Sequence, residues 1–407
     1  MVSRVSGSSR LAIDGGSPVR TGAFPAWPVF GKREEELLLE VLYSGEWSEL
    51  TGSKVNSFIR DFATFQDARF GVPVPNGTLA LEVALQALGV GYGDEVITTA
   101  YTFIATASSA FSVGAHPIFV DIDPETNNID PAKIEEAITP RTKAIVPVHI
   151  GGHPCDMDAI VAIGKRHGIP ILEDAAQAWG SQWRGRGVGA IGDIGTFSFQ
   201  SSKNLTSGEG GAVLTNDQQL FDLAWSLHNV GRLREGGWYQ HEILGRNLRL
   251  TEWCGAILQA QFERLPDDME IRSENAERLN RELSGLPGLT PIKWHDGVTR
   301  SSWHLYQLRY DPELLGDRHR DEFLKALRAE GIPCSSGYVP LIHQPAIRNT
   351  LQERFGPGSL ENLAAVPHAD YAGDHIIWLT QTLLLGTDED VSDIIRAFTK
   401  ITEAWAS

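Results

Sequence analysis

The hydrophobic pattern of the chain alternates between strand-like and helical stretches over roughly its first half. Short apolar runs of strand length cover 95–99, 117–121, 143–149, 170–174, 193–199 and 211–215. Between them, apolar residues recur at helical spacing over 78–88, 105–113, 131–138 and 158–167. This alternation predicts an α/β fold with a mainly parallel sheet covered by helices. Ligands of such sheets bind beyond the carboxyl ends of the strands, so the residues that follow each strand are the first candidates for a site.

The pattern changes near residue 260. A long polar helix is predicted over 258–283, a strand over 303–310, and helices over 318–330 and 391–405. Before residue 30, glycines and prolines interrupt any period, and a helix follows over 33–43. A length of 407 residues is too long for one compact core and suits two domains, or one large domain with an appendage. We therefore predict an irregular N-terminal arm (1–30), a large domain (31–260) and a smaller C-terminal α+β domain (261–407).

Charge and cysteine content narrow the class of protein. A formal net charge of −17 argues against nucleic acid or an anionic membrane as the main partner. No apolar run approaches the roughly 20 residues that a membrane span needs. Three widely spaced cysteines argue against a disulfide framework and a zinc site. We expect a cytoplasmic protein without a resident metal.

Two apparent motifs do not have the context that their chemistry requires. Residues 187–192 match G-x-G-x-x-G, but a strand-like run follows them, whereas a dinucleotide site needs the start of a helix there. His149 and His153 have metal-ligand spacing on a helix, but two glycines lie between them and make a helix unfavourable. The first motif therefore predicts a turn between strands, and the second predicts no metal site.

Three separate segments together indicate pyridoxal 5'-phosphate (PLP). Asp174 ends an apolar strand, where a carboxylate can keep a pyridine nitrogen protonated and so improve the ring as an electron sink. Lys203 follows another strand and precedes a glycine-rich turn, and burial there favours the neutral amine that attacks an aldehyde. Ser198 can donate to a phosphate, and Gly77 and Thr78 open a helix whose N-terminus favours an anion. Taken singly, these features also fit a helix cap or a surface lysine.

These segments resemble the DegT/StrS-type sugar aminotransferases of PLP fold type I, from about Leu11 to the last helix. The resemblance implies an aspartate aminotransferase-like fold, with a mainly parallel seven-stranded sheet in the large domain and a smaller C-terminal α+β domain. It also implies roles for individual residues. Phe103, within Ala-Tyr-Thr-Phe-Ile-Ala-Thr, matches the aromatic side chain that covers the cofactor ring. Asp174 matches the partner of the pyridine nitrogen, Gln177 its neighbour at the ring, Ser198 a phosphate ligand and Lys203 the Schiff-base lysine.

The segment Gly-Arg-Asn-Leu-Arg-Leu-Thr-Glu carries a further implication. It is similar to the family segment that delivers an asparagine, here Asn247, to the phosphate of the neighbouring subunit. The resemblance therefore implies a homodimer with shared active sites.

Other features are similar to the branch of glutamine:scyllo-inosose aminotransferases. They are the arm Leu-Ala-Ile-Asp-Gly-Gly-Ser-Pro-Val-Arg, the pair Trp27-Pro28, Gln200 and the stretch 378–386. Aminohydroxybenzoate synthases share the run Phe-Ser-Phe-Gln that ends at Gln200. Gln177 stands where many sugar-nucleotide members carry histidine, which disfavours a nucleotide-linked substrate.

The implied activity is a ping-pong transfer of an amino group from glutamine or glutamate to a keto cyclitol or keto sugar, in aminocyclitol antibiotic or amino-sugar biosynthesis. Three alternatives stay open: a nucleotide-linked keto-sugar aminotransferase, a dehydratase of the same family, and a non-catalytic PLP-binding regulator. The dehydratases typically carry histidine in place of Lys203. Candidates for the acceptor pocket are His149, His304, Tyr338 and His343, each of which also fits a structural hydrogen-bonding role.

Overall fold

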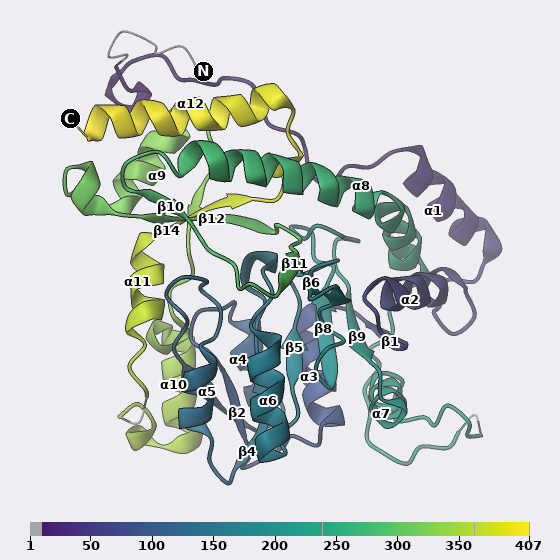
Figure 1. Cartoon of the computed structure of the whole chain (residues 1–407). Helices are drawn as coiled ribbons and strands as arrows, with labels where there is room; N and C mark the ends of the chain where they lie inside the picture. The colour runs from purple at the N-terminus through teal and green to yellow at the C-terminus, as the bar shows by residue number, and fades with distance from the viewer. Residues whose placement is uncertain (1–9, 238, 362, 407) are drawn as a thin grey trace.

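A seven-stranded sheet forms the centre of the larger part of the protein (Figure 1). The computed structural model describes residues 10–237, 239–361 and 363–406. Parallel bridges from Ile145 to Ile171 and from Val148 to Asp174 join a four-stranded and a three-stranded segment. The resulting order is β1 (Phe70–Val74), β9 (Gly211–Thr215), β8 (Ile194–Ser198), β5 (Leu172–Asp174), β4 (Thr142–Val146), β2 (Glu95–Thr99) and β3 (His116–Val120). Only β9 runs against its neighbours in this sheet, so the predicted mainly parallel sheet is confirmed.

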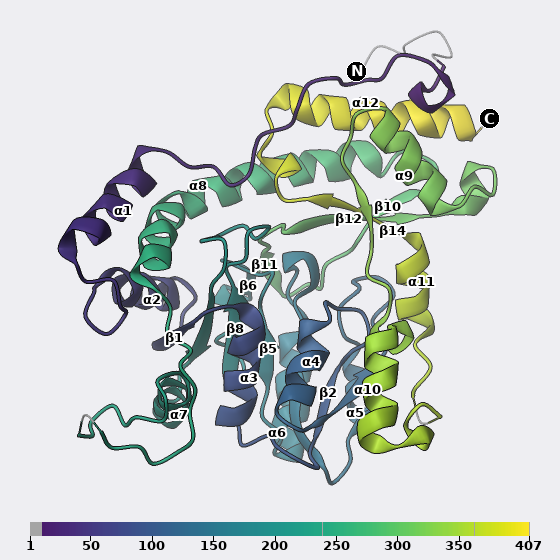
Figure 2. The ribbon, with the colours of Figure 1, turned by 180° about the vertical axis from the view of Figure 1, so that it is seen from behind.

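Helices cover both faces of the sheet because its strands are apolar on both sides. On one face, in front in Figure 1, lie α5 (Pro131–Ala137) and α6 (Met157–His167), and α2 (Lys54–Phe65) packs into the same core. On the other face, in front in Figure 2, lie α3 (Gly77–Ala87), α4 (Ala105–Ser112) and α7 (Gln218–His228). The sheet edge at which the parallel strands end faces the C-terminal part of the chain.

The C-terminal part has its own antiparallel sheet and its own core. Strand order is β10 (Leu289–Pro291), β12 (Leu305–Tyr310), β14 (Ile376–Thr380) and β13 (Ser335–Ser336). Helices α9 (Arg320–Ala329) and α12 (Asp388–Trp405) bury Phe323, Phe398 and Ile401 against it. This arrangement is the predicted α+β architecture. A small ribbon of β11 (Val298–Arg300), β6 (Gln182–Trp183) and β7 (Arg186–Gly187) lies above the sheet edge.

One long helix, α8 (Glu252–Leu283), belongs to both cores. Leu265 and Met269 pack in the core of the large sheet, whereas Leu279 and Leu283 pack in the C-terminal core. The expected boundary after residue 260 thus falls inside a continuous helix, and the division into two domains stays a prediction. Helices α10 (Pro345–Phe355) and α11 (Pro367–His375) also pack against α4 and the strand ends of the large sheet.

The N-terminal arm is irregular as far as the structure describes it, and its residues 1–9 lie outside the described part. It runs along α12 to α1 (Lys32–Ser44), with one 3-10 turn, η1 (Ala12–Asp14) (Figure 2). Backbone N–H groups of Ala12 and Val19 donate to the buried carboxylate of Glu330. Further along, the Trp27 indole donates to the carbonyl of Ser201 at 3.0 Å. The arm therefore connects the C-terminal core to the turn that carries Lys203.

The remaining 3-10 turns are η2 (Ile150–Gly152), η3 (Pro312–Leu315), η4 (Leu341–His343), η5 (Pro357–Ser359) and η6 (Leu383–Leu385). Within the described ranges, none of the helices has both the length and the apolar character needed to cross a membrane.

Candidate active site

The candidate residues lie where the strands of the central sheet end. Asp174 is the last residue of β5, Ser198 is the last residue of β8, and Lys203 lies in the turn that follows β8. Gly77 opens α3 just after β1, and Phe103 lies between β2 and α4. Since β1, β2, β5 and β8 all run the same way, their ends meet at one edge of the sheet.

A close contact joins the start of α3 to the end of β8. Asn76 caps the helix, and its side chain accepts from the N–H of Leu79 at 2.9 Å. A methyl group added to Gly77 would lie 2.8 Å from Cβ of Ser198, so no larger residue fits without displacement. The unsatisfied N–H groups of the first helical turn therefore lie beside the Ser198 hydroxyl. Such a cradle fits the phosphate of PLP, because helix N-termini bind anions.

Lys203 is partly buried, and its Nζ lies 5.9 Å from the centre of the Trp179 ring. Burial lowers the pKa of Lys203 to about 8, although the negative charge of Asp174 acts in the opposite direction. An appreciable fraction of this amine is therefore neutral near neutral pH, as attack on an aldehyde requires.

Asp174 is buried with hydrogen-bond donors on both carboxylate oxygens. Thr106 Oγ1 donates to Oδ2 at 2.8 Å, and the N–H of Ala176 donates to Oδ1 at 3.2 Å. Burial raises the pKa of Asp174, while the bond from Thr106 and the charge of Lys203 oppose that rise. Lysine and aspartate thus lie close enough for each charge to affect the pKa of the other. The acid is buried and the amine is partly buried. An amine opposite a buried acid fits a PLP ring held between them.

Gln177, Phe103 and Tyr338 form one side of the site. The buried Gln177 accepts from the N–H of Gly151 at 2.7 Å and donates through Nε2 to the Tyr338 hydroxyl at 3.1 Å. Phe103 is 57% exposed, and its ring centre lies 6.4 Å from that of Tyr338. Burial raises the pKa of Tyr338 to about 12, so its hydroxyl keeps the proton. Because Gln177 is the donor in their bond, that proton is available to another acceptor.

The three histidines proposed for the acceptor pocket have different surroundings. His304 is buried with Nδ1 2.9 Å from Asn204 Oδ1, and burial together with the charge of Lys203 lowers the pKa of His304 well below its usual value. His149 has protein partners at both ring nitrogens, Glu173 Oε2 at 3.0 Å and the N–H of Cys155 at 3.1 Å. His343 is exposed and pairs with Asp370 at 2.7 Å. The geometry therefore favours a structural role for His149 and places His304 where the charge of Lys203 affects its pKa.

Asn247 is exposed at the end of the segment that bridges to Asn229. Its exposure leaves the side chain available to a second subunit. Among the described residues, no group of three or more His, Cys, Asp or Glu side chains is placed to hold a metal ion.

The glycine run 187–192 binds a carboxylate of the protein itself. Glu173, fully buried beside Asp174, accepts from the N–H groups of Gly189, Ile191 and Gly192 at 2.7–2.8 Å and from His149. Burial opposes ionisation, but the bonds from His149 and these N–H groups lower the pKa of Glu173 below its usual value. The predicted turn between strands is present, between β7 and β8, and its N–H groups satisfy this buried charge.

Sequence reasoning gave no role to several residues around Lys203. Trp179 packs against both Lys203 and His304. Arg272 of α8 is fully buried, its Nε and Nη2 donate to Gln381 Oε1 at 3.0 and 2.6 Å, and burial lowers the pKa of Arg272 to about 10. Arg272 belongs to a helix segment rich in charged residues, so composition alone does not separate it from solvated neighbours.

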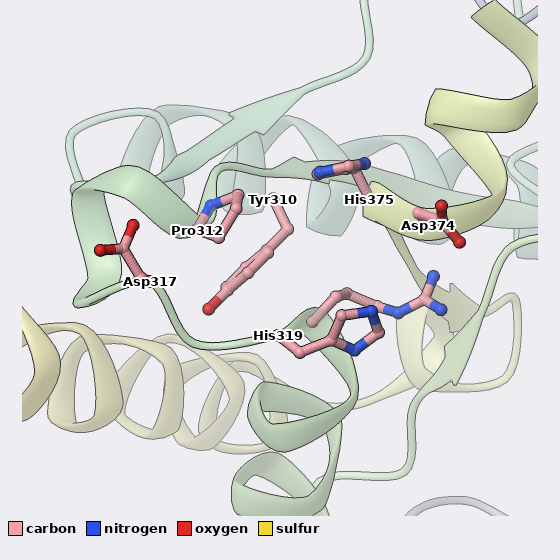
Figure 3. A pocket seen from close by; sticks show the side chains of 7 residues that line it. Tyr310, Pro312, Asp317, His319, Asp374 and His375 are labelled. Atoms are coloured by element: carbon pink, nitrogen blue, oxygen red, sulfur yellow. The ribbon is translucent and has the colours of Figure 1, made fainter. Parts of the chain in front are cut away.

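A surface hollow of about 260 Å³ lies on the C-terminal part of the protein (Figure 3). It is lined by Tyr310, Pro312, Asp317, His319, Arg320, Asp374 and His375. None of the predicted site residues belongs to it, so it is separate from the cluster at the sheet edge.

Comparisons with known proteins agree with this geometry. The profile of the DegT/DnrJ/EryC1/StrS aminotransferase family matches residues 28–399. The chain is 42% identical over 410 residues to a putative L-glutamine:3-amino-2,3-dideoxy-scyllo-inosose aminotransferase of Streptoalloteichus tenebrarius, covering 97% of this chain and 98% of that protein. It is 39% identical over 410 residues to the L-glutamine:2-deoxy-scyllo-inosose aminotransferase of Micromonospora echinospora, covering 96% and 97%.

The fold is similar to that of solved aminotransferases. The crystal structure of 3-amino-5-hydroxybenzoic acid synthase superposes with a TM-score of 0.86 at 34% sequence identity, covering 95% of this chain and 100% of that one. The architecture, the buried lysine and acid, and the nearly full-length similarity lead to one conclusion. The chain belongs to the DegT/DnrJ/EryC1/StrS aminotransferase family and is a PLP-dependent aminotransferase.

Proposed function

We propose that this enzyme transfers the amino group of L-glutamine to the ketone of an inosose-type cyclitol. The observation that carries the proposal is the pair of the partly buried Lys203 and the buried Asp174 at the sheet edge, where each charge affects the pKa of the other group. The donor and acceptor are inferred from relatives whose names specify L-glutamine and an inosose and which match nearly the whole chain.

Lys203 is the proton carrier in this proposal. When bound, PLP supplies an electrophilic carbon and an electron sink for the bond that breaks at the donor α-carbon. The neutral amine of Lys203 would remove the proton from that carbon and pass it to the cofactor carbon within the same half-reaction. With the ketone bound, Lys203 would move a proton the opposite way, from the cofactor carbon to the former ketone carbon. Its lowered pKa suits both roles near neutral pH.

Other residues bind and orient the cofactor. Gly77, Thr78 and Ser198 would hold the phosphate through the helix N-terminus and the hydroxyl groups. Asp174 would pair with the ring nitrogen, and Phe103 and Gln177 would flank the ring.

Tyr338 recognises the acceptor. Its hydroxyl oxygen accepts from Gln177, so the hydroxyl proton points elsewhere and can be donated to an oxygen of the cyclitol. His304, kept neutral by burial and by the charge of Lys203, supports the same pocket. His149 is hydrogen-bonded to Glu173 and Cys155, and His343 pairs with Asp370. Each remains a candidate only for a contact in addition to these.

We further propose a homodimer with shared active sites in the cytoplasm. Exposed apolar side chains gather on α1 and the loop after it: Leu39, Leu42, Tyr43, Trp47 and Leu50. Such a patch is typical of an interaction surface. Asn247 is exposed and would reach the phosphate in the site of the partner subunit. The three free cysteines suit a reducing compartment.

The pH dependence of cofactor attachment tests the role of Lys203. We expect the rate at which the apoenzyme forms its covalent bond with PLP to rise with pH with a midpoint at about 8 and to level off above it, because protonated Lys203 cannot attack. Asp174→Asn should move the midpoint to lower pH, since the charge of Asp174 raises the pKa of Lys203. Stopped-flow absorbance gives the rates, and borohydride reduction with peptide mass spectrometry locates the bond. Attachment that persists in Lys203→Ala would contradict the assignment.

A panel of ketones tests the acceptor. With glutamine as donor, we expect scyllo-inosose or 2-deoxy-scyllo-inosose to give an amino product and one equivalent of the keto acid derived from glutamine, measured by mass spectrometry. Nucleotide-linked keto sugars should react at least about tenfold more slowly, in kcat/KM, because the site is then built for a free cyclitol. Conversion of nucleotide-linked ketones alone would refute the cyclitol assignment. A deoxygenated product, or no turnover with any ketone, would favour the dehydratase or the regulatory protein.

Removal of the Tyr338 hydroxyl tests acceptor recognition. Tyr338→Phe should lower kcat/KM for the cyclitol about tenfold or more, because one hydrogen bond to the substrate is lost. The half-reaction with glutamine should keep its rate, measured in single turnover. Tyr92→Phe is the matched control, because Tyr92 is 97% exposed. Equal losses in both half-reactions would indicate a structural role for Tyr338.

Mixed dimers test the shared site. Asn247→Ala should weaken PLP binding, and Lys203→Ala should abolish covalent attachment. A dimer with one copy of each variant contains one site in which both side chains are intact, so it should regain tight, covalent binding at half of its sites. The variants are co-expressed with different tags and purified through both. A mixed dimer no better than Asn247→Ala alone would place Asn247 outside the partner's site.

A further inference from the structure

Two threonine hydroxyls lead to the carboxylate of Asp174. Thr106 Oγ1 lies 2.8 Å from Asp174 Oδ2, and Thr102 Oγ1 lies 3.1 Å from Thr106 Oγ1. Both threonines are nearly inaccessible to solvent, with exposed fractions of 2% and 3%. Neither hydroxyl therefore has bulk water as an alternative partner.

The carboxylate of Asp174 determines which hydroxyl donates in each of these hydrogen bonds. An ionised carboxylate has no proton to give, so the single hydrogen of the Thr106 hydroxyl must point to Asp174. The Thr106 oxygen then accepts, and the hydroxyl of Thr102 is its donor. Hydrogen bonds arranged in series in this way polarise one another, which strengthens the last bond to the charge.

The position of Thr106 adds to the effect. It lies in the first turn of α4, where the helix N-terminus favours a nearby negative charge. The Thr106 carbonyl also accepts from the Ser109 hydroxyl at 3.0 Å, which holds this turn in place. In the described part of the chain, Thr106 supplies the side-chain hydrogen bond to Asp174, and the backbone N–H of Ala176 holds the other oxygen at 3.2 Å.

Asp174 needs such support because burial favours its uncharged form. A protonated carboxyl group could not form an ion pair with a protonated ring nitrogen. Holding both oxygens also fixes the plane of the carboxylate, and each oxygen keeps a second lone pair for a further partner.

We propose that Thr102 and Thr106 form a positioning relay that keeps Asp174 ionised and oriented toward the ring nitrogen of PLP. The inference rests on the proposed role of Asp174 and extends it to two residues that do not touch the cofactor. Thr106 is a positioning residue, and Thr102 acts through Thr106.

Three substitutions separate the hydroxyl from the shape of the side chain. Thr106→Val keeps the branched shape and removes the donor, whereas Thr106→Ser keeps the donor. Thr102→Val removes only the first member of the relay. Ser108→Ala is the matched control on the same helix, because the Ser108 hydroxyl bonds to the carbonyl of Ala105 and not to Asp174.

Two measurements report on the relay without turnover. One is the dissociation constant of PLP for the apoenzyme, and the other is the 15N chemical shift of the pyridine nitrogen of bound, labelled PLP, which reports its protonation. Thr106→Val should weaken PLP binding about tenfold and move the shift toward that of the unprotonated ring, because a hydrogen bond to a buried charge is lost. Thr102→Val should change both in the same direction but less, and Thr106→Ser and Ser108→Ala should stay within about twofold of the parent protein.

The results for the three threonine variants can each refute the relay. If Thr106→Val folds, as judged by circular dichroism, and leaves both readouts unchanged, the relay does not exist. If Thr106→Ser fails as badly as Thr106→Val, the methyl packing matters rather than the donor, and the proposal is also overturned. If Thr106→Val does not fold, an unchanged ring-nitrogen shift in Thr102→Val overturns the relay and a partial shift supports it.

Asp174→Asn distinguishes a failure of the relay proposal from a failure of the proposed function. Should Asp174→Asn leave the ring-nitrogen shift unchanged, Asp174 is not the partner of the ring. Should Asp174→Asn change the shift while Thr106→Val does not, the role of Asp174 stands and only the relay is refuted.

Discussion

Burial of a carboxylate near a lysine is the constraint on which the site depends. Water would stabilise both charges, and burial, complete for Asp174 and partial for Lys203, reduces that stabilisation. Asp174 then needs hydrogen-bond donors to stay ionised, and Lys203 moves toward its neutral form. Burial causes both pKa shifts, but their consequences for the reaction differ. The acid must stay charged to pair with the ring nitrogen, whereas the amine must be uncharged to attack.

The rest of the fold supplies what these two groups lack. Parallel strands bring their ends to one edge, so Asp174, Ser198 and Lys203 meet although they belong to different segments. Helix α3 adds N–H groups for an anion, and α4 adds the hydroxyl on Asp174. The arm and α8 hold the C-terminal part over this edge through Trp27 and the buried Arg272. The site is therefore a property of the whole chain rather than of one motif.

Much of the large domain and the positions of Asp174 and Lys203 could be predicted from sequence, because apolar strand patterns precede both residues. The apolar strand before Asp174 and the Ser/Lys turn after β8 placed the acid and the amine correctly at strand ends. The pattern does not predict strand β1, because Gly71 and Pro73 interrupt it, an interruption that an edge strand tolerates. It does not predict helices α2 and α7 or strand β14 either.

Contacts between distant segments left no local signal. The partners of His149 and the burial of Arg272 depend on segments far along the chain, so no spacing rule reveals them. Thr106 was visible as part of a family-like stretch, but its bond to Asp174 joins residues 68 positions apart and needs coordinates.

The turn that encloses Glu173 has a wider consequence. A concave run of backbone N–H groups recognises negative charge and is indifferent to whether that charge belongs to a nucleotide or to the chain itself. Glycine fingerprints in other sequences will therefore include cases in which the anion is an internal side chain. A buried acid on the adjacent strand, as here, distinguishes a glycine-rich loop that binds a side chain of its own protein from one that binds a cofactor.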